Sequence, residues 1–110
     1  MKIISGTTEE IYVRTNVDIS SIKEIEIVLS DCTKEIQIVK NLIDCEEVDG
    51  NTLKVRLSDE ETLQLNPYNM KTHGYCQVRM IDDDGVVEAN SMLEFVIEPF
   101  LKEGVIEYEQ

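Results

Sequence analysis

Residues 24–29 read EIEIVL, and this alternation of charged and apolar side chains decides the fold class. Successive side chains of an extended strand point to opposite faces, so Ile25, Ile27 and Leu29 share one face. An amphipathic helix would instead repeat its apolar residues every three or four positions. The stretch therefore predicts a half-buried β-strand.

The same period of two continues along the chain. It recurs in residues 35–39 (EIQIV), 53–57 (LKVRL) and 76–80 (CQVRM), and less regularly in 11–13, 43–48 and 86–97, where Leu93, Phe95 and Ile97 share one face. Turn signals lie between these runs: DGN at 49–51, NP at 66–67, THG at 72–74 and DDDG at 82–85. No helical crossover of the kind that a parallel sheet needs is visible. The pattern predicts an all-β fold, an antiparallel immunoglobulin-like β-sandwich of about seven strands.

One segment departs from the strand pattern. Ser58 followed three residues later by Glu61 matches a capping box, which predicts one short helical turn near Ser58 to Thr62. The alternation also stops after residue 99. A chain of 110 residues suits a single core, so we expect a β-sandwich domain over residues 1–99 and a C-terminal extension over residues 100–110.

The charge balance restricts the partners. Ten basic and 23 acidic side chains give a formal net charge of −13, which repels nucleic acid and anionic membrane surfaces. The first residues lack the apolar core of a signal peptide, so we expect synthesis in the cytoplasm. Two interpretations of the charge stay open: solvated carboxylates on exposed strand faces, or a surface complementary to a basic partner or a cation.

The sequence offers little for catalysis. The single histidine, His73, precedes a glycine in a predicted turn and is interpreted as a solvated loop residue. Cys32, Cys45 and Cys76 are too irregularly spaced for a zinc site or a disulfide framework, and Cys76 is expected to be a small buried side chain. Phosphate-binding and nucleophile motifs are absent from the sequence. We therefore predict no enzymatic activity, no catalytic residue and no cofactor.

Three groups of residues could instead serve binding. Asp82, Asp83 and Asp84 are weak candidates for calcium ligands, although solvated turn residues have the same pattern. A tyrosine patch of Tyr12, Tyr68 and Tyr75 would favour a sugar, although tyrosines in strands are ordinarily packing residues. These two groups support an alternative function, a cation- or carbohydrate-binding β-sandwich module. Val28 and Val39 lie opposite the main apolar stripe and mark either a contact between subunits or ordinary exposed side chains.

Five segments of the second half carry a further pattern: residues 57–63 (LSDEETL), 74–80 (GYCQVRM), 84–87 (DGVV), 90–92 (NSM) and 101–106 (LKEGVI). In these segments the chain resembles small prophage proteins of Gram-positive bacteria, which are similar to the immunoglobulin-like N-terminal module of phage baseplate upper proteins. The resemblance implies a structural or assembly role in a virion, after synthesis in the bacterial cytoplasm. The implied partners are other phage structural proteins or the chain itself, so we expect an oligomer or a component of a complex.

The C-terminal extension is the first place in which we expect such contacts. Interfaces commonly combine apolar side chains with a charged rim, so Phe100, Leu101, Val105 and Ile106 are the candidate partner-binding residues. A frayed terminus would have the same composition.

Overall fold

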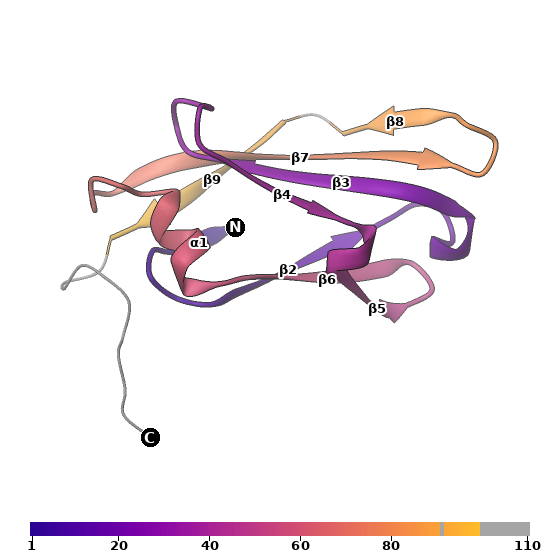
Figure 1. The fold of residues 1–110 in the computed structure, drawn as a ribbon, viewed down its shortest axis with the longest axis horizontal. Coiled ribbons are helices and arrows are strands. Elements are labelled where there is room, and N and C mark those ends of the chain that lie inside the picture. Colours follow the sequence, from indigo (N-terminus) through magenta and orange to yellow (C-terminus); the bar gives the residue numbers. More distant parts are fainter. Residues whose placement is uncertain (91, 100–110) are drawn as a thin grey trace, which may run out of the picture.

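The computed structural model describes residues 1–90 and 92–99, which form two β-sheets packed face to face (Figure 1). Sheet A has the strand order β1-β9-β7-β3-β4, with β8 also paired to β7, and sheet B has the order β2-β6-β5. The strands are β1 (Lys2–Ile4), β2 (Glu9–Arg14), β3 (Ile22–Ser30), β4 (Gln37–Asn41), β5 (Cys45–Asp49), β6 (Thr52–Leu57), β7 (Thr72–Asp82), β8 (Val87–Ala89) and β9 (Leu93–Glu98). Two 3-10 turns, η1 (Ile19–Ser21) and η2 (Leu42–Asp44), and one short helix, α1 (Asp59–Gln64), connect them.

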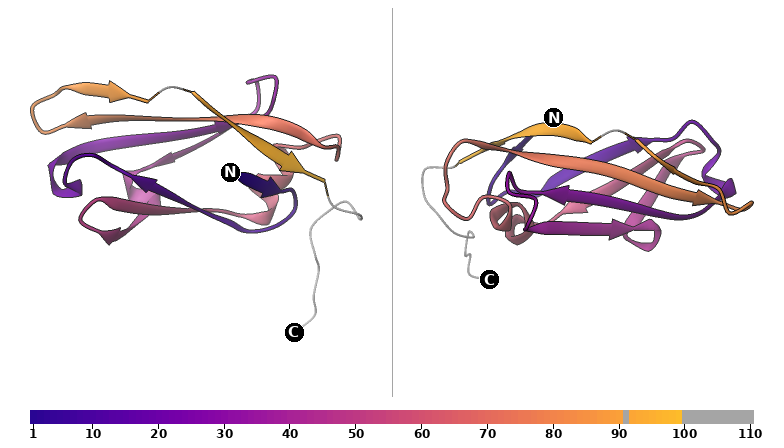
Figure 2. Two further views of the ribbon diagram at one scale, coloured as in Figure 1. Left: turned by 180° about the vertical axis from the view of Figure 1, so that it is seen from behind. Right: turned by 90° about the horizontal axis from the view of Figure 1, so that it is seen from above.

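The strand order confirms the predicted immunoglobulin-like β-sandwich. The chain runs from β2 in sheet B to the hairpin β3-β4 in sheet A, crosses through η2 to β5-β6, and returns through α1 to β7. This Greek-key exchange between a three-stranded and a larger sheet is typical of immunoglobulin-like domains. Among the described strands, only the short β1 pairs in parallel, with β9, and Figure 2 shows β9 lying between β1 and β7.

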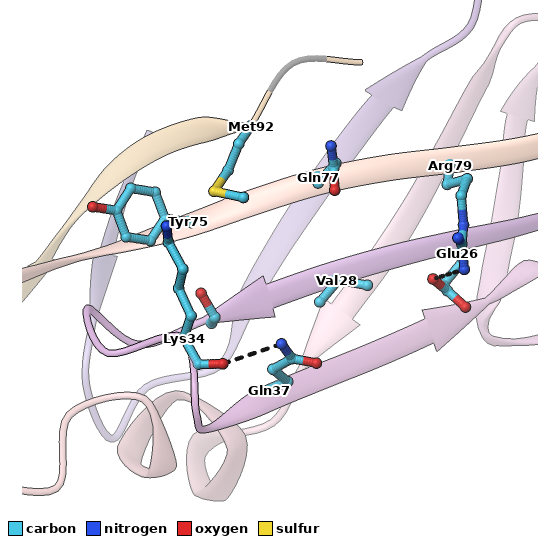
Figure 3. A pocket seen from close by; sticks show the side chains of 9 residues that line it. Glu26, Val28, Lys34, Gln37, Tyr75, Gln77, Arg79 and Met92 are labelled. Atoms are coloured by element: carbon cyan, nitrogen blue, oxygen red, sulfur yellow. Dashed lines mark hydrogen bonds and ion pairs between the residues drawn. The ribbon is translucent and has the colours of Figure 1, made fainter. Parts of the chain in front are cut away.

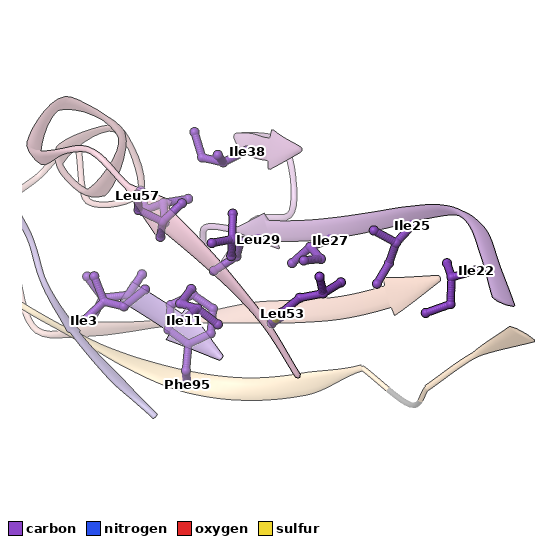
Figure 4. Packing of buried hydrophobic residues seen from close by; sticks show 14 of the residues in the cluster. Ile3, Ile11, Ile22, Ile25, Ile27, Leu29, Ile38, Leu53, Leu57 and Phe95 are labelled. Atoms are coloured by element: carbon purple, nitrogen blue, oxygen red, sulfur yellow. The ribbon is translucent and has the colours of Figure 1, made fainter. Parts of the chain in front are cut away.

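The core lies between the sheets and follows the predicted alternation (Figure 4). Ile25, Ile27 and Leu29 of β3 are fully buried in a core cluster that also includes side chains of β6 and β9. Each such side chain contributes about 1.5–3 kcal/mol when it leaves water completely. The opposite residues of β3, Glu26 and Val28 among them, lie on the outer face of sheet A.

Helix α1 begins with the predicted capping box. The Glu61 backbone N–H donates to Ser58 Oγ (3.1 Å), and Glu61 Oε1 accepts from the Ser58 backbone N–H (2.9 Å). Lys40 of β4 lies 2.9 Å from the same carboxylate. Partial burial opposes the charged form of Glu61, but the bonds from Lys40 and Ser58 outweigh it and lower the pKa of this carboxyl. This ion pair joins sheet A to the crossover that follows sheet B.

The predicted loop at residues 72–74 is wrong, because these residues begin strand β7. Gly74 points inward, where an added Cβ would collide with the Ser30 carbonyl oxygen and come within 2.7 Å of Phe95 Cζ. Gly74 resembles a turn signal in the sequence, but in the structure it allows neighbouring strands to pack closely because it has no side chain. His73 is accordingly a half-buried strand residue, with its Nε2 3.2 Å from the Tyr75 hydroxyl, and not a solvated loop residue.

Two predicted strand runs are also divided. Residues 43–48 begin in the turn η2 and enter β5 only at Cys45. Residues 86–97 form two strands, β8 and β9, and between them the side chain of Asn90 takes the place of a strand partner. Its Oδ1 accepts the Val78 backbone N–H at 2.7 Å, so the edge of β7 stays paired where the strands separate.

Candidate interaction surface

Strands β4, β3 and β7 place a set of side chains on the outside of sheet A. Antiparallel pairing puts directly opposed residues on one face, and the register opposes Val39 to Val28 and Val28 to Gln77. We call this surface the sheet A outer face and define it by Glu26, Val28, Ser30, Lys34, Gln37, Val39, Asn41, Tyr75, Gln77, Arg79, Met92 and Glu94.

A hollow of about 240 Å³ lies in the middle of this face (Figure 3). The Lys34 ammonium lies 4.8 Å from the centre of the Tyr75 ring, and the Gln37 side chain donates to the Lys34 carbonyl oxygen (3.1 Å). Lys34 has a positive φ of 66°, which turns the β3-β4 connection back over the sheet. Small-molecule sites usually enclose about 300–1,000 Å³, so this hollow suits a side chain of a partner protein better than a small ligand.

The sheet A outer face has little charge for a chain of net charge −13. Glu26 is neutralised by Arg79 at 2.9 Å, and the two negative residues of the face (Glu26 and Glu94) balance its two positive residues (Lys34 and Arg79), so their charges sum to zero. The residues between these charges are neutral, and Val39 and Met92 are 46% and 47% exposed. An exposed, weakly charged face with apolar side chains is typical of a protein-binding surface.

The outside of sheet B has a different composition. We define the sheet B outer face by Glu10, Tyr12, Arg14, Glu46, Lys54 and Arg56. Lys54 pairs with Glu46 (3.1 Å) and Arg56 with Glu10 (3.5 Å), and the hydrogen bond that Lys54 donates to the Glu46 carboxylate raises the pKa of Lys54. Such cross-strand charge pairs are compatible with a face that stays in water.

A second hollow, of about 330 Å³, opens between β2 and the β7-β8 end of sheet A. Its apolar lining comes from Val13, Val78 and Met80, which pack against the buried core. This hollow is the open margin of the core, and it gathers no set of groups for a reaction.

The three calcium candidates lie in the turn between β7 and β8, and the side chain of Asp82 stabilises this turn. Asp82 Oδ1 accepts the backbone N–H groups of Asp84 (3.0 Å) and Val86 (2.9 Å), and Gly85 has the positive φ of 82° that this turn requires. In the described ranges, 1–90 and 92–99, no three His, Cys, Asp or Glu side chains come together as metal ligands. Asp83 and Asp84 are exposed.

The remaining candidates are dispersed. Tyr12 lies on the sheet B outer face and Tyr75 on the sheet A outer face, so the tyrosines form no common patch. Cys76 is buried as predicted, and burial raises the pKa of its thiol. The three cysteines are free thiols. Phe100, Leu101, Val105 and Ile106 lie outside the described residues.

The sequence contained part of the signal for the sheet A outer face. Val28 and Val39 were recognisable as apolar residues on the charged side of their strands. Tyr75 was named only as part of a tyrosine patch, and Lys34 and Met92 were missed. Their proximity depends on the β3-β4 turn and on the pairing of β7, neither of which the local pattern specifies.

Comparisons with known proteins add weak structural likeness. No family model and no curated protein matches the chain. Among solved structures, the V domain of amphioxus IgVJ-C2 is similar, at 14% identity, with 89% of this chain and 99% of that domain covered and a TM-score of 0.31. The description of the fold therefore rests on the strand order of this chain. No helix in the described part of the chain is long and apolar enough to cross a membrane.

Proposed function

We propose that this chain is a structural or assembly protein of a phage or prophage that acts through protein–protein contacts of the sheet A outer face. The observation that carries the contact is the low charge of this face in a chain of net charge −13. The phage assignment is supported by the sequence resemblance in residues 57–106. In this proposal the chain is made in the bacterial cytoplasm and becomes part of a virion, with no nucleic acid or membrane as partner.

The test is whether the chain is present in particles. We expect mass spectrometry of gradient-purified particles, from an induced host that carries the gene, to detect this chain in a fixed ratio to a major structural protein. Its absence from particles and from assembly intermediates, while the gene is expressed, would contradict the proposal.

The C-terminal extension supplies a second set of proposed contacts, through Phe100, Leu101, Val105 and Ile106. Deleting residues 100–110 should leave the melting temperature nearly unchanged, because the core formed by the described residues spans Ile3 to Ile97, but should reduce incorporation into particles. Unfolding of the shortened chain would instead assign the extension to the core of the domain.

A further inference from the structure

We propose that the occupant of the sheet A outer face is a second copy of this chain, related to the first by a two-fold axis. This inference rests on the proposed function, which assigns protein contacts to the face, and it adds the identity of the partner. Size, charge and the exposed edge of sheet A each support it.

The size of the face suits a dimer. The nine residues of β3 span about 30 Å at about 3.3 Å each, and four strands about 4.8 Å apart cover roughly 20 Å with their side chains. The resulting area of about 600 Å², before the relief of the side chains is counted, approaches the roughly 800 Å² per partner of a standard interface.

The charges permit two copies to meet here. Two chains of net charge −13 repel each other, and an interface that buried unpaired carboxylates would add a desolvation cost. On this face Glu26 is already paired with Arg79, and its central residues are neutral. The remaining carboxylates are Glu94, at the β9 margin of the face opposite Tyr75, and Glu24 on β3; both are exposed and lie away from the central residues.

The arrangement of the charged groups fits a two-fold axis. In Figure 3, Val28 lies between Lys34 at one end of the hollow and the Glu26–Arg79 pair at the other. A two-fold axis that lies in the interface near Val28 and runs across the strands would place each Lys34 beside the Glu26 end of the other copy. Within the described residues the Lys34 ammonium has no carboxylate partner and lies over Tyr75, so it is available for this contact.

Strand β4 is the free edge of this sheet and lacks the usual protection. Lysines commonly guard exposed edge strands, but Lys40 is turned toward Glu61 and only 17% of its side chain is exposed. Val39 is left uncovered on this edge. A second copy on the sheet A outer face would cover this apolar side chain.

The test compares two exposed valines on edge strands of the two sheets. Val39 of β4 is 46% exposed and Val48 of β5 is 52% exposed. We expect sedimentation velocity to show a concentration-dependent dimer of the full chain. Val39→Glu should raise its dissociation constant by at least about tenfold, since two-fold symmetry buries the new carboxylate twice. Val48→Glu, the matched control, should leave the dimer unchanged, and thermal melting should show that both variants fold.

The salt dependence of dimerisation is an independent test of the inference. Because the two copies carry like net charge, raising the salt from about 0.1 M to about 0.5 M should strengthen a dimer that forms through a weakly charged face. A dimer that weakens with salt, a loss in Val48→Glu equal to that in Val39→Glu, or a monomer at every concentration would overturn the inference. A monomer that is found in purified particles would refute the dimer and leave the proposed function standing, whereas a dimer absent from particles would do the reverse.

Discussion

The outer faces of the two sheets differ although both belong to one strongly acidic chain. On sheet B, Lys54 and Arg56 are paired with Glu46 and Glu10 across neighbouring strands. On sheet A, Val28 and Val39 occupy the corresponding central positions. In a strongly acidic chain, charged residues on a strand face do not by themselves indicate a binding surface. A face with little net charge is the more informative feature, because it departs from the composition of the rest of the chain.

The largest predicted effect is on the free energy of unfolding, and it comes from the packing between the strands of sheet A. Gly74→Ala should destabilise the fold by about 1–3 kcal/mol, because the new methyl group collides with the Ser30 carbonyl oxygen and with Phe95. Gly50→Ala, in the hairpin of sheet B, is the control, since nothing lies within 4 Å of the added Cβ. Urea unfolding of both variants measures the difference. Equal free energies of unfolding would show that sheet A does not depend on this close approach.

The alternating strands were predictable because burial on one face imposes a period of two on the sequence. Ile25, Ile27 and Leu29 follow that rule, and the capping box of Ser58 and Glu61 is equally local. Strand β1 was not predictable, since its three residues are fixed only by pairing with β9 at the other end of the chain.

The candidate site was predictable only in part. The sequence marks Val28 and Val39 as apolar residues on an otherwise charged side. Their direct opposition depends on the register of the β3-β4 hairpin, and the position of Lys34 over Tyr75 depends on a positive φ that a lysine rarely adopts. Such features arise from tertiary pairing, which local propensity does not encode.

The link between the sheets gives a prediction of intermediate size. Glu61→Gln keeps an acceptor for the Ser58 backbone but removes the charge that faces Lys40, so it should cost about 1 kcal/mol at neutral pH. The folded pKa of Glu61 lies below its unfolded value, so its contribution is complete above the unfolded pKa and is lost as the pH falls through the folded pKa.

The difference in free energy of unfolding between the original chain and Glu61→Gln should therefore shrink below about pH 4. Glu60→Gln, one residue earlier in the same helix, is the control for a general loss of negative charge in the first turn. A difference that stays constant from pH 7 to pH 3 would mean that the ionised form of Glu61 does not act through Lys40.

The smallest effect is expected on the sheet B outer face. Lys54→Gln removes the partner of Glu46, but both groups lie in water, so the melting temperature should fall slightly at low salt and match that of the original chain at about 0.5 M salt. The dissociation constant of the proposed dimer should not change, in contrast to Val39→Glu. If Lys54→Gln weakened self-association as much as Val39→Glu does, the two outer faces would share one role. The contrast between a solvated face and a contact face would then be wrong, because an ion pair of the sheet B outer face would contribute to an interface that was assigned to the sheet A outer face alone.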